Sequence, residues 1–145
     1  KSSEKKYIIE KLNKNFGIGK IPYLLIRSGK ERIRAFSGHL SKEEILQINR
    51  LTNLEAVGIY FMKEENEKEI RLTLDAIHLL QYQITKNTLE ISQENTPEWL
   101  RGKDLSIKAP YGPVILTHNF YLLGFGKSTG EKILNFIPKE RRLKK

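Results

Sequence analysis

One stretch decides the fold of this 145-residue chain: Leu122-Leu-Gly-Phe-Gly-Lys-Ser-Thr-Gly-Glu-Lys-Ile-Leu-Asn-Phe-Ile-Pro-Lys-Glu-Arg-Arg142. Two apolar segments, the first interrupted by glycines, are followed by a basic end. Short apolar runs bounded by glycine and proline are typical of β-strands. The stretch therefore predicts a strand pair that carries lysines and arginines on its exposed side.

The same stretch contains a rival motif, because Gly126-Lys127-Ser128 resembles the end of a P-loop. A phosphate-binding loop needs another glycine five positions before its Gly-Lys-Ser, so that backbone N–H groups wrap the phosphates. Tyr121 occupies that position. The pair Gly17 and Gly19 fails as a dinucleotide-binding motif for a similar reason, because the third glycine would fall at Pro22. Neither nucleotide-binding motif is complete.

Composition narrows the classes of chemistry that are open to the chain. It has no cysteine, which removes disulfides, cysteine-ligated zinc and thiol nucleophiles together. The three histidines, His39, His78 and His118, are not at metal-ligand spacing. We find no catalytic signature and predict neither a metal nor a cofactor. No apolar run is long enough for a membrane span and the first six residues are polar, so we expect a cytoplasmic protein without a membrane partner.

Charge is distributed unevenly along the sequence. The net charge of +9 divides into about +7 for residues 1–54, −5 for residues 55–100 and +7 for residues 101–145. Basic ends around an acidic middle steer a polyanion toward part of the surface rather than the whole of it. This pattern favours a nucleic-acid partner, with a lysine-rich solubilising surface as the alternative.

The first part of the chain predicts a small α-β-β-α domain over residues 1–54. Residues 4–16 have the apolar spacing of an amphipathic helix, and Gly17 ends it. Two strands, 23–26 and 32–36, flank the turn signal Ser28-Gly29-Lys30. A second helix begins at Ser41 and continues toward residue 53, with Glu44 completing a capping box.

The second part, residues 55–145, predicts a mixed β-barrel. A helix is expected over residues 75–82, and Thr96-Pro97 predicts an N-cap followed by proline at the first helical position. The expected strands are 57–62, 70–74, 89–91, 114–117, 121–125 and 133–137. Many short strands with few helical turns favour a small, partly closed barrel within an α+β fold.

Three blocks of this second part resemble the PUA-type RNA-binding domain. They are Arg71-Leu-Thr-Leu-Asp-Ala-Ile-His-Leu-Leu80, then Trp99-Leu-Arg-Gly-Lys-Asp-Leu105, then Gly112-Pro-Val-Ile-Leu116 with Leu123-Gly-Phe-Gly-Lys-Ser-Thr129. The order of the blocks is most similar to ribosome-biogenesis factors of archaea and eukaryotes, which join a pre-PUA domain to a PUA domain. The resemblance implies a pre-PUA-like domain over residues 1–54, a PUA-like domain over residues 55–145 and binding to rRNA or tRNA.

The tail from Lys132 to Arg142 also resembles the PUA-like appendix of RNA cytosine-5 methyltransferases. Those enzymes activate the cytosine ring by adding a cysteine thiolate to it. A sequence without cysteine cannot supply that thiolate, so we expect this chain to bind RNA without methylating it.

The predicted RNA-binding residues are cations in or beside the three blocks. Arg101 and Lys103 flank Gly102 directly after Trp99, where a flexible backbone lets both side chains meet phosphate. The full predicted set is Arg71, Arg101, Lys103, Lys127, Lys132, Lys139, Arg141 and Arg142. Lys144 and Lys145 are explained equally well as a frayed end.

Two further groups are candidates for contact with a partner. Arg27, Lys30, Arg32 and Arg34 cluster on one hairpin and form a second candidate basic patch, for phosphate or for a protein. Tyr111, Phe125 and Phe136 are candidates for stacking on unpaired bases, with burial in the core as the alternative. Trp99 is expected in the core, with its indole N–H bonded locally.

The sequence thus favours a non-catalytic RNA-binding protein of ribosome biogenesis or RNA modification. Its partners would be rRNA or tRNA, together with RNA-modification or ribosome-assembly proteins. Two alternatives remain open: a specificity subunit of an RNA-modifying methyltransferase complex, and a protein–protein adaptor with a basic hairpin that meets an acidic partner.

Overall fold

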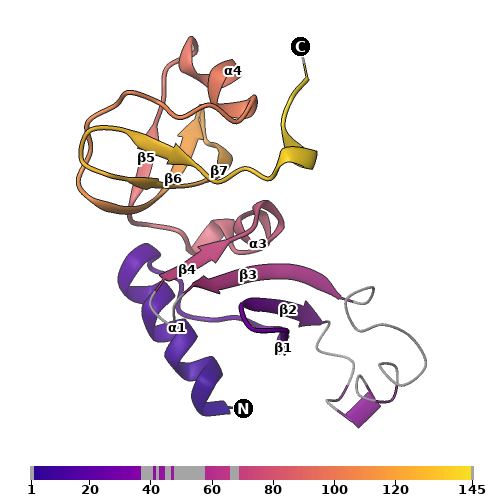
Figure 1. Cartoon of the computed structure of the whole chain (residues 1–145). Helices are drawn as coiled ribbons and strands as arrows, with labels where there is room; N and C mark the ends of the chain where they lie inside the picture. Colours follow the sequence, from indigo (N-terminus) through magenta and orange to yellow (C-terminus); the bar gives the residue numbers. More distant parts are fainter. Residues whose placement is uncertain are drawn as a thin grey trace.

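The computed structural model describes residues 2–36, 41, 43, 44, 47, 58–65 and 69–144. Within these residues the strands form two four-stranded sheets, each with helices packed beside it (Figure 1). The predicted α+β class is confirmed. The predicted barrel is wrong, because the two sheets stay separate and neither closes on itself.

The first sheet is an antiparallel meander in the order β1-β2-β3-β4. Its strands are β1 (Leu24–Ser28), β2 (Arg32–Phe36), β3 (Ile59–Glu65) and β4 (Glu69–Leu72). The predicted turn between β1 and β2 is confirmed, with Ser28 opposite Arg32 and Gly29 at a φ of +76°. Glycine adopts this left-handed backbone without the steric cost that a side chain brings.

Helix α1 (Ser2–Phe16) packs beside this sheet (Figure 1). Ile8, Leu12 and Phe16 recur every four residues and so lie on one helix face, where all three are buried in the first core. Gly17 ends the helix as predicted, with a φ of +85° and its N–H bonded to Asn13 O at 2.9 Å.

The predicted boundary between residues 54 and 55 lies between β2 and β3, which are neighbours in one sheet. Strands from both predicted domains therefore share a layer, and the division into two domains stays a prediction. The predicted capping box is present: Glu44 N donates to Ser41 Oγ at 3.1 Å. Most of the helix expected to follow it, up to residue 53, lies outside the described residues.

A short helix joins the two halves of the molecule. Helix α3 (Leu74–Leu79) contacts β3 of the first sheet and β7 of the second, and the single-turn 3-10 helix η2 (Gln81–Gln83) follows it. Thr73 caps α3 by accepting a bond from Ala76 N at 3.2 Å. The predicted helix over residues 75–82 is thus divided into two shorter elements.

The second sheet has the order β5-β6-β7-β8, with β5 parallel to β6 and the other pairs antiparallel. Its strands are β5 (Thr88–Glu90), β6 (Gly112–His118), β7 (Tyr121–Ser128) and β8 (Ile133–Asn135). The stretch 122–142 therefore forms a strand pair, β7 with β8, as predicted. The second of these strands ends two residues earlier than expected.

Helix α4 (Asn95–Leu100) covers this sheet, and the chain ends in the 3-10 turn η3 (Lys139–Arg141) and a short tail (Figure 1). The predicted N-cap at Thr96 is wrong. The helix already includes Asn95, whose N–H donates to Ser92 Oγ at 3.2 Å, so Pro97 lies inside the first turn.

Trp99 is the centre of a second core between α4 and the second sheet. It is fully buried, and its indole N–H donates to Leu123 O at 3.1 Å, as predicted. The second sheet contributes to both cores, because Ile115 and Phe125 belong to the first core and Val114 and Leu116 to the second.

Candidate nucleic-acid interface

The end of α4 and the carboxyl-terminal tail lie side by side. Leu143 N donates to Leu100 O at 2.8 Å, which attaches the tail to the last turn of the helix. Arg142 folds back and donates from Nε to Ile137 O at 2.9 Å. Its side chain covers Gly102, where a Cβ atom would collide with the guanidinium. Glycine at this position lets the tail approach the loop that follows α4.

Asn135 holds the same region from the side of β8. Its amide nitrogen donates to Trp99 O at 2.7 Å and to Lys103 O at 3.0 Å. Its amide oxygen accepts from Ile137 N at 2.8 Å. One side chain thus binds the end of α4, the loop after it and the start of the tail.

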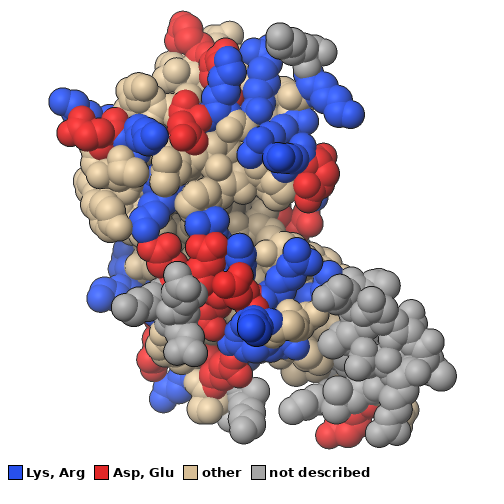
Figure 2. Space-filling model, in the orientation of Figure 1, with Lys and Arg blue, Asp and Glu red and all other residues tan. Residues whose placement is uncertain are grey.

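This packing gathers cations from segments about 40 residues apart. Figure 2 shows lysine and arginine side chains over α4 and the tail, at the upper right of the molecule. We call this surface the tail patch and define it by Arg101, Lys103, Lys139, Arg141, Arg142 and Lys144, together with Lys132 directly before β8, which lies 3.9 Å from Asp104 in the loop after α4. It contains six of the eight predicted residues and adds Lys144.

Carboxylates neutralise part of the tail patch. Glu98 pairs with Lys103 at 2.8 Å and with Arg101 at 3.5 Å. The hydrogen bond from Lys103 is the main reason why the pKa of Glu98 is lowered from its ordinary value. Arg141 pairs with Asp75 at 3.3 Å, and Lys132 lies 3.9 Å from Asp104.

Three cations of the tail patch form no ion pair with a carboxylate of the described residues: Lys139, Arg142 and Lys144. Because Glu98 is shared by two cations, it also leaves an excess of positive charge at the end of α4. The tail patch therefore keeps a net positive charge that an anion is able to neutralise.

The structure places the other two predicted residues, Arg71 and Lys127, at the junction between the sheets. The Arg71 guanidinium lies 3.6 Å from the centre of the Phe136 ring and 2.7 Å from Glu65. Lys127 pairs with Glu69 of β4, and this hydrogen bond is the main reason why the pKa of Lys127 is raised. Both cations connect the two halves of the molecule and lie apart from the tail patch.

The structure does not gather the second candidate basic patch on one surface. Arg27 stands opposite Ile33 in the sheet, so its side chain lies on the face opposite to that of Arg32 and Arg34. Its guanidinium bridges Glu4 and Glu64. On the other face Arg32 lies 5.3 Å from the Tyr60 ring centre, while Arg34 donates to Gly58 O at 3.3 Å and Lys30 lies in the turn.

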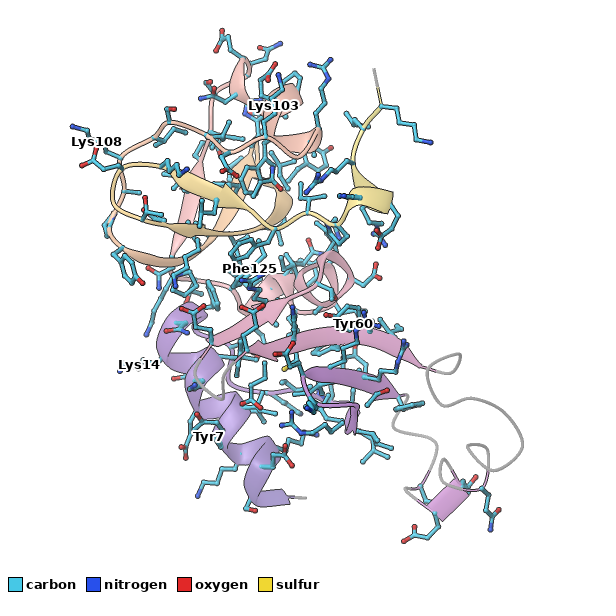
Figure 3. The ribbon with its side chains drawn as sticks, in the orientation of Figure 1. Tyr7, Lys14, Tyr60, Lys103, Lys108 and Phe125 are labelled. Carbon is cyan, nitrogen blue, oxygen red and sulfur yellow. The ribbon has the colours of Figure 1, made fainter. Side chains whose placement is uncertain are left out.

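The three aromatic candidates for base stacking differ in their exposure. Phe125 is only 5% exposed and lies between the sheets, so the core alternative holds for it (Figure 3). Phe136 is partly buried and stacks against Phe125 with ring centres 6.3 Å apart, and Arg71 covers it. Tyr111 is exposed, with the Lys127 ammonium 5.1 Å from its ring centre. Of the three candidates, Tyr111 is the one whose ring is exposed.

Asn135 is the positioning residue that sequence reasoning missed. Its partners Trp99 and Lys103 lie more than 30 positions away, so no local spacing indicates the contact. Within the described part of the chain, no cluster of three His, Asp or Glu side chains is arranged to hold a metal ion. No helix of that part has the length and apolarity that a membrane span requires.

Residues 86–143 match the family model described as the methyltransferase RsmF PUA domain. This range begins just before β5 and ends after η3, so it covers the second sheet, α4 and most of the tail patch. The predicted resemblance of this region to a PUA-type domain is confirmed. The closer resemblance to two-domain ribosome-biogenesis factors stays a prediction.

A curated relative is similar to part of the chain. The chain is 33% identical over 57 residues to ribosomal RNA small subunit methyltransferase F of Shewanella woodyi. The alignment covers 37% of this chain and 12% of that protein. The similarity therefore concerns a small part of a much longer relative.

Proposed function

We propose that this chain binds RNA through the tail patch without catalysing a reaction. The observation that carries the proposal is the packing of the tail against α4, which leaves Lys139, Arg142 and Lys144 without carboxylate partners among the described residues. Cations that are held close together and lack internal partners are suited to contact a chain of phosphates.

The resemblance supports RNA as the polyanion, because PUA-type domains are RNA-binding domains. The name of the relative, a ribosomal RNA small subunit methyltransferase, points to rRNA in the context of methylation. We propose rRNA as the first choice and tRNA as the second. The same RNA-binding surface would also suit a specificity subunit of an RNA-modifying complex. In that complex another protein, with a cysteine thiolate of its own, would transfer the methyl group.

Two exposed lysines of the tail patch give the sharpest test. Lys139→Glu combined with Lys144→Glu removes two proposed phosphate contacts, and neither lysine side chain forms a hydrogen bond or ion pair with the described residues. We expect the affinity for a single-stranded RNA to fall about tenfold and the slope of log K against log salt to drop by about 1.4. The thermal midpoint should stay within about 2 °C of that of the parent protein.

The matched control is Lys20→Glu combined with Lys86→Glu, which changes the net charge equally at exposed sites outside the tail patch. Affinities are measured by fluorescence anisotropy over a range of salt concentrations. If both pairs weaken binding alike, only the net charge matters and the tail patch is not the site. Tail-patch variants that bind RNA like the parent protein would favour the adaptor alternative.

A further inference from the structure

The tip of the β6–β7 hairpin has a feature that the tail patch does not explain. Phe120 is 99% exposed and adopts a φ of +71°, next to Asn119 at +49°. His118 pairs with Tyr121, so this is a two-residue hairpin turn with both residues left-handed. Glycine is the favoured second residue of such turns, and a phenylalanine there is strained.

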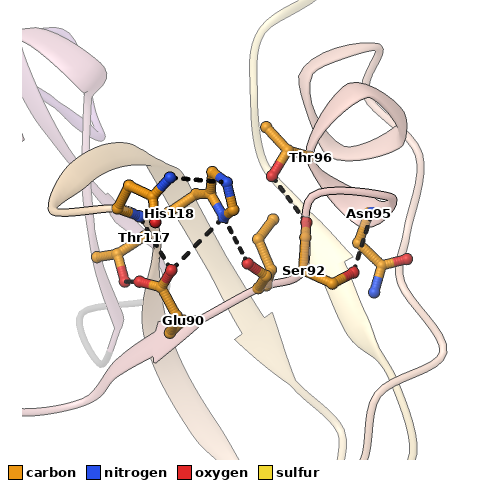
Figure 4. A network of polar contacts seen from close by, with 8 residues as sticks. Glu90, Ser92, Asn95, Thr96, Thr117 and His118 are labelled. Carbon is orange, nitrogen blue, oxygen red and sulfur yellow. Dashed lines mark hydrogen bonds and ion pairs between the residues drawn. The ribbon is translucent and has the colours of Figure 1, made fainter.

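A network of polar contacts holds the turn in this conformation (Figure 4). Glu90 accepts from Asn119 N at 2.9 Å and from Thr117 Oγ1 at 3.0 Å. His118 Nδ1 lies 2.8 Å from Ile91 O. The bond from the Asn119 N–H is the main reason why the pKa of Glu90 is lowered, so the carboxylate is the form that anchors the turn.

The exposed ring lies at one end of α4, and the tail patch lies at the other. Ile91 and Ser92, which contact His118 and Asn95, lead directly into the helix. Six residues of helix span about 9 Å. The Trp99 indole binds Leu123 of β7, three residues after Phe120, and so fixes this hairpin against the helix.

We propose that Phe120 stacks on an unpaired base of the RNA strand whose phosphates lie on the tail patch. This inference rests on the proposed function and adds to it the state of the RNA. One ring face is enough to hold one base. A docked protein needs about 800 Å² of surface, whereas the surroundings of this tip are polar: Glu90, His118 and Asn119. Tyr121, also exposed, offers a second ring beside it.

The test compares Phe120→Gly and Phe120→Trp in the full chain, with a 12-nucleotide oligouridine and a 12-base-pair RNA duplex as probes. Glycine suits the left-handed backbone, so Phe120→Gly should raise the thermal midpoint by roughly 2–6 °C. It should weaken oligouridine binding at least about fivefold, since a stacked base is lost, and leave the salt slope unchanged. Binding of the duplex should not change. Phe120→Trp should retain the affinity for oligouridine.

Tyr82→Ala is the matched control, because Tyr82 is an equally exposed aromatic residue on a different element, η2. Unchanged oligouridine binding by Phe120→Gly would overturn the inference, and the proposed function would stand if the Lys139→Glu and Lys144→Glu pair still weakened binding. Equal losses for oligouridine and duplex would also overturn it, because the bases inside a duplex are stacked on both sides and offer no free face to the ring.

Discussion

Two glycines in the Leu-Gly-Phe-Gly stretch leave the space that Trp99 fills. A Cβ atom on Gly124 would lie 3.2 Å from the Trp99 indole nitrogen, and one on Gly126 would lie 2.8 Å from the far edge of the ring. Ser128 is buried and donates to Ala109 O at 2.8 Å, so it holds a neighbouring loop. The motif that resembles a P-loop is therefore a packing motif.

The first prediction concerns Gly126. In Gly126→Ala the new methyl group would also lie 2.5 Å from Leu134 O, so the strand pair or Trp99 must shift. We expect the free energy of unfolding to fall by about 1–3 kcal/mol, as in other overpacked cores. Urea denaturation measures this change. Gly19→Ala is the control, since its Cβ would lie 3.6 Å from the nearest atom, and an equal loss in both variants would contradict the packing argument.

At the scale of single elements, the correct predictions are the helices and strands that a local sequence pattern marks. Strand β2 has the predicted bounds, because Arg32–Phe36 alternates between polar and apolar residues beside a glycine turn. Strand β8 ends at Asn135, two residues before the apolar run ends. There Ile137 N donates to the Asn135 side chain instead of a neighbouring strand. The same side chain also binds Trp99 O and Lys103 O, more than 30 positions away, and no local pattern indicates those contacts.

The second prediction tests how the tail is held. Asn135→Ala leaves the carbonyl groups of Trp99 and Lys103 without their side-chain donor. We expect a loss of about 1–2 kcal/mol in the free energy of unfolding and weaker RNA binding, because the tail patch is no longer held together. Asn13→Ala, at an exposed position of α1, is the control. Full RNA affinity in Asn135→Ala would show that RNA binding by the tail patch does not depend on the hydrogen bonds of the Asn135 side chain.

At the scale of the whole molecule, two expectations failed because they depend on contacts between distant residues, which no local sequence pattern shows. The barrel did not form because β3 pairs with β2, across the predicted domain boundary. The second basic patch divided because the strand register places Arg27 on one sheet face and Arg32 on the other. Pairing and register depend on residues distant in sequence, whereas Arg101 and Lys103 lie near each other because they are two positions apart, and their part in RNA binding stays a prediction.

The third prediction separates the sheet junction from the RNA surface. Arg71→Met removes the guanidinium that covers Phe136 and pairs with Glu65. We expect the free energy of unfolding to fall by about 1 kcal/mol, since the loss of the aromatic contact is partly offset by removing a buried Nε without a partner. RNA affinity should stay within about twofold. A larger loss of RNA affinity would show that Arg71 takes part in RNA binding and would contradict its separation from the tail patch.

The central claim, that RNA lies on the tail patch, is tested most directly by titrating the isotope-labelled protein with single-stranded RNA and following its backbone amide signals by NMR. The account predicts that the largest shifts fall in residues 98–103 and 139–144, where α4 meets the tail. Shifts confined to residues 27–34 of the β1–β2 hairpin, or spread evenly over both sheets, would contradict it.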